Sequence, residues 1–262
     1  MSEKMILGAQ MYTIRKFASN NEDFARSMEK LAKIGYKYVQ VSGIGKDVTP
    51  DAIAKASKDT GLKIVLTHTD MNRVIEETDA VIEEHTLYGC DCVGIGGGWM
   101  YKPFNAEAID DMTGKLAAAI EKITAAGKTF AYHNHKFEYE RGADGKLFLD
   151  KILEKSPKMM LTLDLYWVQA GGADPAVDIE KYADKIYTTH FKDMRIVENE
   201  QKYAEVLEGN MNYDRIIEAC LKCGVKRHMV EQDDVLPGQD PFDCLETSYK
   251  NVMARYGQYF EQ

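Results

Sequence analysis

A short apolar segment followed by a helical segment recurs along the whole chain, and this recurrence limits the folds that the sequence can adopt. Apolar runs predict strands at eight places, which are residues 5–11, 38–41, 63–67, 92–95, 129–133, 159–164, 186–191 and 227–231. Helical spacing of apolar residues follows at 20–34, 50–60, 71–88, 105–126, 144–156, from 174 onward, 212–223 and 241–256. The strands begin about 30 residues apart, which is the size of one strand–helix unit.

Eight such units predict an α/β chain folded as a (β/α)8 TIM barrel, with residues 1–262 in a single domain. The competing fold is an open doubly wound sheet, which would carry a glycine-rich phosphate turn after its first strand. The chain reads GAQMYTIR at 8–15, without that glycine pattern. The long connection at 191–211 is expected to form a loop or a short hairpin over one rim.

Charge and hydropathy exclude several classes of protein. The net charge of −9 argues against a nucleic-acid partner, which would need a basic face. No apolar run approaches the roughly 18 residues of a membrane helix, and the start of the chain lacks the apolar region of a signal peptide. We therefore expect a cytoplasmic protein without a membrane partner. Cys220 and Cys223 have no second pair at zinc-finger spacing, so the five cysteines are expected to be reduced, buried thiols.

Polar and ionisable residues gather where the predicted strands end. In a barrel these ends form one rim, which is where active sites lie. The densest stretch is 128–138, in which His133, His135 and Glu138 fall within six residues. The residues expected at or near the rim are Gln10, Tyr12, Gln40, Ser42, His68, Asp70, Trp99, His133, Asn134, His135, Glu138, Asp164, Tyr166, Trp167, His190, Lys192, Asp193, Arg195, Glu231, Gln232, Asp233 and Asp234.

Three of these residues come from different strands and have the side chains of metal ligands. Taken singly, Asp164 could cap a helix, His190 could be structural and Glu231 could belong to a solvated acidic loop. Their convergence on one rim instead predicts a site for one divalent ion, because mixed nitrogen and oxygen ligands suit such metals. The candidate ions are Mn, Co, Zn, Ni and Mg.

Other rim residues are candidates for substrate contact. Trp99 and Trp167 could stack on the apolar face of a sugar ring or simply pack at the rim. Lys192 and Arg195 could pair with a carboxylate or phosphate of the substrate, or form rim salt bridges to Asp193 or Glu198. The remaining candidates are Gln10, His68 and His135.

Motifs at 8–15, 131–139, 161–167, 190–193 and 229–232 together resemble the sugar phosphate isomerase/epimerase family. That family shares the xylose isomerase-like TIM barrel of the AP endonuclease family 2 superfamily with inosose dehydratase and endonuclease IV. The resemblance implies a metal held by Glu, Asp, His and Glu from the last four strands. Three of these fall on Asp164, His190 and Glu231, but His133 stands where many relatives have the first glutamate. Either His133 or Glu138 would then be the fourth ligand.

The resemblance also implies an activity in carbohydrate metabolism. In the epimerase branch, two ligand glutamates on opposite faces of the substrate remove and return a proton next to a carbonyl. This makes Glu231, His133 and Glu138 the catalytic candidates in a metal-dependent isomerase or epimerase of a sugar or sugar phosphate. The alternative is a lyase or dehydratase of a keto-sugar or inosose-like polyol. A phosphodiesterase would need more metal ligands and a basic face, and a sugar-binding subunit without catalysis is a further alternative. The expected partner is a small carbohydrate, and a homo-oligomer is compatible with the sequence.

Overall fold

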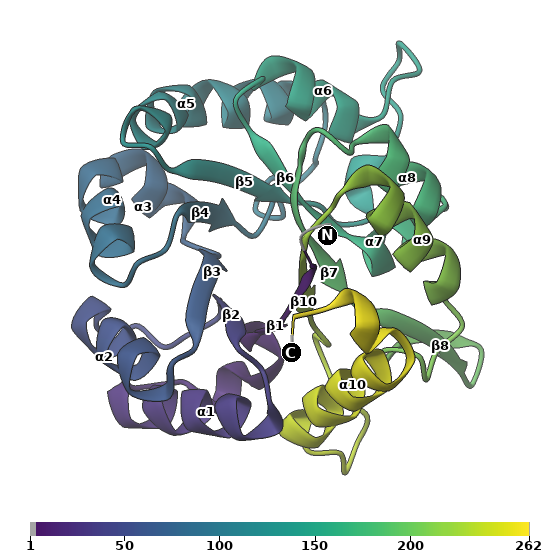
Figure 1. Ribbon diagram of the computed structural model, residues 1–262. Helices are drawn as coiled ribbons and strands as arrows, with labels where there is room; N and C mark the ends of the chain where they lie inside the picture. Colours follow the sequence, from purple (N-terminus) through teal and green to yellow (C-terminus); the bar gives the residue numbers. More distant parts are fainter. Residues whose placement is uncertain (1–3, 262) are drawn as a thin grey trace.

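Eight parallel strands surround a central axis in the computed structural model, which describes residues 4–261. They are β1 (Ile6–Gln10), β2 (Tyr38–Val41), β3 (Lys63–Thr67), β4 (Cys92–Ile95), β5 (Thr129–His133), β6 (Met160–Asp164), β7 (Ile186–Phe191) and β10 (Arg227–Val230). Their order in the sheet is β3-β2-β1-β10-β7-β6-β5-β4 (Figure 1). The predicted TIM barrel is thereby confirmed, together with the position of each predicted strand.

Helices form a ring outside the strands (Figure 1). They are α1 (Asn21–Ile34), α2 (Pro50–Thr60), α3 (Met71–Glu76), α4 (Thr78–Leu87), α5 (Ala106–Ala125), α6 (Phe148–Lys155), α7 (Leu165–Ala170), α8 (Pro175–Lys181), α9 (Tyr213–Cys223) and α10 (Pro241–Tyr256), with 3-10 turns η1 (Met11–Phe17), η2 (Phe137–Tyr139) and η3 (Gly257–Tyr259). Helix α1 illustrates how the local sequence determines where a helix begins, which face it buries and where it ends. Asn20 caps its first turn, Phe24 and Leu31 bury one face against the barrel, and Gly35 ends it with a φ of 118°.

The barrel closes between β3 and β4 through a narrow seam. The Thr69 N–H donates to the Gly94 carbonyl oxygen at 2.8 Å, just beyond the end of β3. A Cβ on Gly94 would lie 2.3 Å from the Thr67 carbonyl oxygen, so only glycine allows this approach. The seam matters for function because His68 and Gly96 follow directly on either side of it.

Side chains fill the barrel interior in layers, as alternate residues of each strand point inward. Met229 and Ala131 pack together in a small apolar layer with residues of β3 and β4. A Cβ on Gly8 would lie 2.6 Å from the Met229 sulfur, so glycine on β1 makes room for that side chain. Two residues further along the same strands stand Glu231 and His133, so the apolar layer is the floor of the polar rim.

The structure corrects three details of the predicted elements. The helix predicted at 71–88 is two helices, because Glu77 leaves helical geometry at φ −121° and ψ 33°. The first strand ends at Gln10, and η1 replaces any further strand. Helix α7 follows Asp164 without a loop and was not predicted, because its six residues are too short for a periodic signal.

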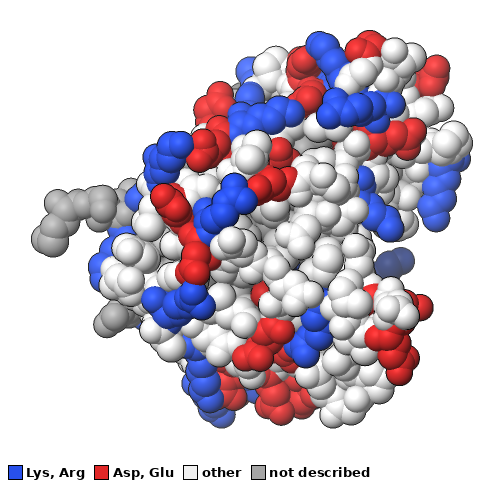
Figure 2. All heavy atoms as spheres, turned by 90° about the vertical axis from the view of Figure 1, so that its right-hand side faces the viewer, with Lys and Arg blue, Asp and Glu red and all other residues white. Residues whose placement is uncertain are grey.

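The 191–211 connection contains a hairpin, one of the two expected forms, built from β8 (Asp193–Val197) and β9 (Glu200–Ala204). The five cysteines are free thiols, as expected. Four of them are buried, but Cys223 is partly exposed, which differs from the expectation. No helix within residues 4–261 is long and apolar enough to cross a membrane. On the face shown in Figure 2, basic and acidic side chains are intermixed over the helices.

Candidate metal centre

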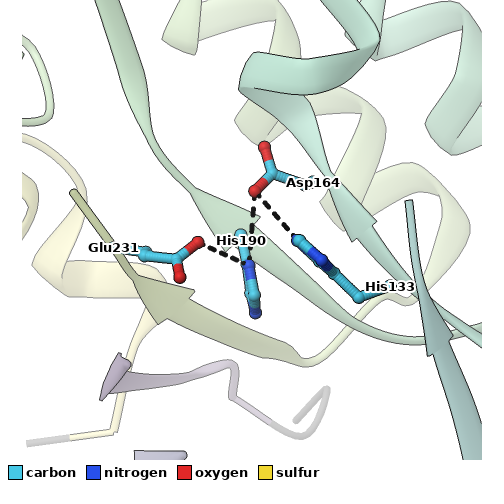
Figure 3. Close-up of side chains that lie close together, drawn as sticks. All are labelled: His133, Asp164, His190 and Glu231. Carbon is cyan, nitrogen blue, oxygen red and sulfur yellow. Dashed lines mark hydrogen bonds and ion pairs between the residues drawn. The ribbon is translucent and has the colours of Figure 1, made fainter. Parts of the chain in front are cut away.

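Four buried side chains from consecutive strands of the sheet converge at one end of the barrel. They are His133 at the end of β5, Asp164 at the end of β6, His190 in β7 and Glu231 directly after β10. One ligand atom from each lies within 4.8 Å of the others, and Figure 3 shows the side chains pointing toward a common centre. Because neighbouring parallel strands end at one level, three separate stretches of sequence meet the 128–138 stretch here.

Short contacts define the geometry of this group. Asp164 Oδ2 lies 3.2 Å from His133 Nε2 and 3.3 Å from His190 Nδ1, and His190 Nδ1 lies 2.9 Å from Glu231 Oε2 (Figure 3). On the other side of its ring, His190 Nε2 lies 2.7 Å from Gln40 Oε1, to which its N–H donates. This outer hydrogen bond orients the ring and directs Nδ1 at the two carboxylates, as is usual for a metal-binding histidine.

The two carboxylate oxygens of Asp164 have different roles: one caps a helix and the other belongs to the four-residue group. Oδ1 accepts the Trp167 N–H at 3.0 Å and so caps α7, while Oδ2 faces the other members of the group. The Asp164 backbone N–H donates to Asn134 Oδ1 at 2.9 Å, which links the end of β6 to the loop after β5. The Trp167 N–H therefore orients the carboxylate, and Asn134 fixes the backbone that carries it.

Lys192 brings a buried cation into the same place. Its Nζ lies 2.9 Å from Asp164 Oδ2, 2.7 Å from Glu231 Oε2 and 2.7 Å from Asp233 Oδ1, and its side chain is fully buried. The rim salt bridge considered from sequence, to Asp193 or Glu198, is wrong. Asp193 instead accepts four backbone N–H groups of residues 194–211.

Burial and charge pairing set the ionisation of the group. Burial works against the charged form of Asp164 and Glu231, but Lys192 and the histidines outweigh it and hold the pKa of both carboxyls below its usual range. Burial also opposes the charge on His190, yet Glu231 and Asp164 raise its pKa to about 9. The pKa of His133 is lowered, mainly by burial.

These residues fit a divalent cation. Two imidazole nitrogens and two carboxylate oxygens are the donor set that such metals take in proteins. With both histidines neutral, the single charge of Lys192 leaves two negative charges uncompensated among Asp164, Glu231 and Asp233, and one divalent ion would balance them. Without a metal, a protonated His190 supplies part of that balance.

A cavity of about 440 Å³ opens beside this group. Its lining residues are Tyr12, Ser42, Gly43, His68, Thr69, Asp70, Met71, Ile95, Gly96, Gly97, Trp99, Met100, His133, His135, Glu231 and Asp233. Four predicted site residues besides Glu231 therefore line it, namely His68, Trp99, His133 and His135. A volume of this size is typical of a small-molecule site.

The other predicted site residues lie outside this lining. Gln10 is buried and its Oε1 accepts the Tyr12 N–H at 2.9 Å. The ring of Trp167 lies 5.6 Å from that of His135 and 5.5 Å from Lys192 Nζ. Arg195 pairs with Glu205 and is not among the residues that line the cavity.

Glu138 is fully buried but does not join the four-residue group. Its Oε1 accepts the Tyr132 hydroxyl at 2.7 Å, and its Oε2 accepts the His135 N–H at 2.7 Å. The Tyr132 oxygen in turn accepts the Gly98 N–H at 2.9 Å, so one carboxyl ties the loop after β5 to the loop after β4. Burial raises the pKa of Glu138 to about 8, although both hydrogen bonds oppose the shift.

Three residues that contribute to the site had no distinct signal in the sequence. Gln40, Asn134 and Asp233 were expected only as rim residues, without a role of their own. Their contacts to His190, Lys192 and Asp164 depend on which strands are neighbours in the sheet. Asp233 follows β10, which is the neighbour of β7 in the sheet, so strand order places it near Lys192. No sequence feature indicates that Gln40 of β2 contacts β7.

A parallel barrel with its polar residues at the carboxyl ends of the strands defines the class of TIM-barrel proteins. Residues 28–230 match the family described as the xylose isomerase-like TIM barrel, and the chain belongs to that family. No match is found among curated proteins.

Solved structures of similar fold agree with this assignment. A sugar phosphate isomerase/epimerase from Parabacteroides distasonis is 22% identical with a TM-score of 0.80, covering 97% of this chain and 96% of that one. An L-ribulose 3-epimerase is 16% identical with a TM-score of 0.75, covering 98% and 96%. The probable 3-DHS dehydratase AsbF from Bacillus anthracis is 14% identical with a TM-score of 0.70, covering 96% and 100%. At these identities the likeness establishes the fold.

Proposed function

We propose that this protein is a divalent-metal-dependent enzyme that isomerises or epimerises a sugar or sugar phosphate by moving a proton next to a carbonyl. The observation that carries the proposal is the convergence of His133, Asp164, His190 and Glu231 within 4.8 Å beside a cavity. The named activities of the isomerase and epimerase neighbours belong to those proteins and support this reading by analogy.

In this proposal His133, Asp164, His190 and Glu231 hold the metal. When bound, the ion would polarise the carbonyl and hydroxyl oxygens of the substrate and so acidify the adjacent C–H group. Gln40 and Asn134 orient the ligands from outside, and Lys192 keeps the two carboxylates ionised and close together.

Glu231 is the proposed base. It borders the cavity, and Lys192 and His190 hold the pKa of its carboxyl low, so it is ionised at neutral pH. The second proton-transfer group is His133, which also borders the cavity. Its Nε2 faces Asp164 and the proposed metal, so the neutral ring would carry its hydrogen on Nδ1. Among residues 4–261 that atom has no hydrogen-bond partner, and its N–H could donate to a substrate oxygen.

Glu138 is proposed as a positioning residue and not as a proton carrier. Both of its oxygens are taken up by the Tyr132 hydroxyl and the His135 N–H, and it does not border the cavity. Its effect on catalysis would pass through the placement of His135 and of the loop at Gly98.

The second candidate is a lyase or dehydratase that uses the same residues. The observation that favours it is His133 at the end of β5, because a carboxylate base and an imidazole N–H that donates to the departing hydroxyl group suit the removal of water. A dehydratase is among the structural neighbours, and that name is a property of the neighbour.

Solvent deuterium separates the two candidates. The metal-loaded protein is incubated in D2O with a panel of ketoses and inososes, and products are followed by NMR and mass spectrometry. Deuterium on carbon without loss of water supports the isomerase or epimerase. Loss of one water supports the lyase, and neither change in any compound contradicts both. Glu231→Gln should abolish the exchange, because Gln can neither accept the proton nor supply the carboxylate ligand of the metal.

A further inference from the structure

The charges around the cavity bear on whether its ligand is phosphorylated. Resting on the proposed function, we infer that the cavity takes a neutral polyhydroxyl compound and discriminates against its phosphate ester. Among the residues described as lining the cavity, none is Lys or Arg, and Asp70, Glu231 and Asp233 are carboxylates. Lys192 and a bound divalent ion would balance Glu231 and Asp233, so the charge that would repel a phosphate is that of Asp70. A phosphate recognition site needs cations or converging backbone donors, and like charges placed close together disfavour binding.

The cations that touch the lining are already paired. Arg15 lies over the Tyr12 ring at 4.3 Å, but its guanidinium donates to the Asp233 carbonyl oxygen at 2.5 Å and to Asp234 Oδ1 at 2.8 Å. Lys192 is buried among three carboxylates, including Glu231 and Asp233. A phosphate entering the cavity would have to compete with these carboxylates for each cation.

Three buried imidazole nitrogens without hydrogen-bond partners in the described part of the chain, by contrast, belong to residues that line the cavity. Among residues 4–261, no hydrogen bond reaches the buried atoms His68 Nε2, His133 Nδ1 and His135 Nδ1, and all three residues line the cavity. A Cβ on Gly97 would lie 3.0 Å from His135 Nδ1, so any larger residue there would crowd that atom. An imidazole nitrogen can donate or accept according to its tautomer, and a hydroxyl group can do either, so the set matches a polyol.

Two aromatic side chains at the mouth complete this chemistry. Trp99 is 59% exposed and Tyr12 is 37% exposed, and both line the cavity. Sugars present apolar C–H faces as well as hydroxyl groups, and an exposed aromatic ring packs against such a face. Aromatic rings also contribute no positive charge for a phosphate.

Paired ligands test the inference. Isothermal titration of the metal-loaded protein compares D-fructose with D-fructose 6-phosphate, D-ribulose with D-ribulose 5-phosphate, and myo-inositol with its monophosphate. We expect binding of at least one neutral compound, and a dissociation constant at least about tenfold higher for its phosphate. Inorganic phosphate should not compete.

Asp70→Asn isolates the charge at the mouth. Asp70 Oδ1 caps α3 by accepting the N–H groups of Asn72 and Arg73, and asparagine preserves that cap. In this variant, the ratio of the dissociation constants of the phosphate ester and the neutral compound should fall about threefold. The change is modest because Asp70 is exposed and its charge is screened by solvent ions. Asp240→Asn removes the same charge from the cap of α10, outside the lining, and should leave the preference unchanged.

The outcomes separate this inference from the proposed function. Equal or tighter binding of a phosphate ester would overturn the inference, as would failure of every neutral compound to bind. If a neutral compound binds more tightly than its phosphate ester but no compound shows solvent deuterium exchange or loss of water, the inference is upheld and the proposed function is contradicted.

Discussion

Metal binding to the four-residue group should release a proton from His190. Glu231 and Asp164 raise the pKa of His190 to about 9 in the metal-free protein, so its ring is almost fully protonated at pH 7. A metal ligand must be unprotonated, and displacing the proton two pH units below the pKa costs about 2.7 kcal/mol. The apparent affinity at pH 7 should therefore be about a hundredfold below its limit at alkaline pH.

Calorimetric titration with Mn²⁺ tests this coupling. At pH 7, buffers of different ionisation enthalpy should report the release of about one proton per metal, and the affinity should rise about tenfold per pH unit between pH 6.5 and 8.5. His228→Gln removes a buried histidine of β10 outside the group and should leave the proton count unchanged. A pH-independent affinity, or a proton count near zero, would refute the electrostatic account of His190.

Three further predictions concern the residues around the group. Gln40→Leu should weaken metal binding about 10- to 100-fold in a calorimetric titration, because His190 loses the hydrogen bond that orients its ring; unchanged affinity would refute that role. Lys192→Met should lower the free energy of unfolding of the metal-free protein by about 3–5 kcal/mol, measured by urea denaturation. Added metal should raise the free energy of unfolding more in this variant than in the wild type. An equal increase in both proteins would contradict the view that Lys192 and the metal balance the same carboxylates. The folded-state pKa of Glu138 is about 8, above its usual 4.5, so its contribution to stability is fully present below about pH 4.5 and is lost as pH rises through 8. Between pH 5 and 8, the free energy of unfolding of the wild type should fall by about 1.4 kcal/mol per pH unit relative to that of Glu138→Gln. If the free energies of unfolding of the two proteins change with pH in parallel, the carboxyl is not buried as described.

The barrel could be predicted from sequence because its signal is local and repeated. Each unit carries its own start and stop, such as Asn20 and Gly35 around α1 or Asp174 and Pro175 before α8, and eight repeats leave few alternatives. Short elements without a period were missed. Helix α7 is one example, and the break at Glu77 is another, because neither changes the apolar spacing over a long window.

The site could be predicted only as far as strand ends can be found. Asp164, His190 and Glu231 were expected to meet because each ends a strand, and the structure brings them together. Whether His133 or Glu138 joins them depends on the path of the chain after β5, which the sequence leaves open. The 3-10 turn η2 points Glu138 back toward Tyr132, and this turn has no strong sequence signal. The ion-pair partners of Lys192 depend on contacts between strands, and the alternative considered from sequence, a salt bridge to Asp193 or Glu198, was wrong.

The metal content of the purified protein tests the central proposal most directly. Elemental analysis after gel filtration should find about one divalent ion per chain in the wild type, and little or none in Asp164→Ala and Glu231→Gln. Asp174→Ala removes a carboxylate that caps α8, away from the group, and should retain the metal. Full occupancy in both site variants, or a wild-type protein that takes up no divalent metal, would contradict the account.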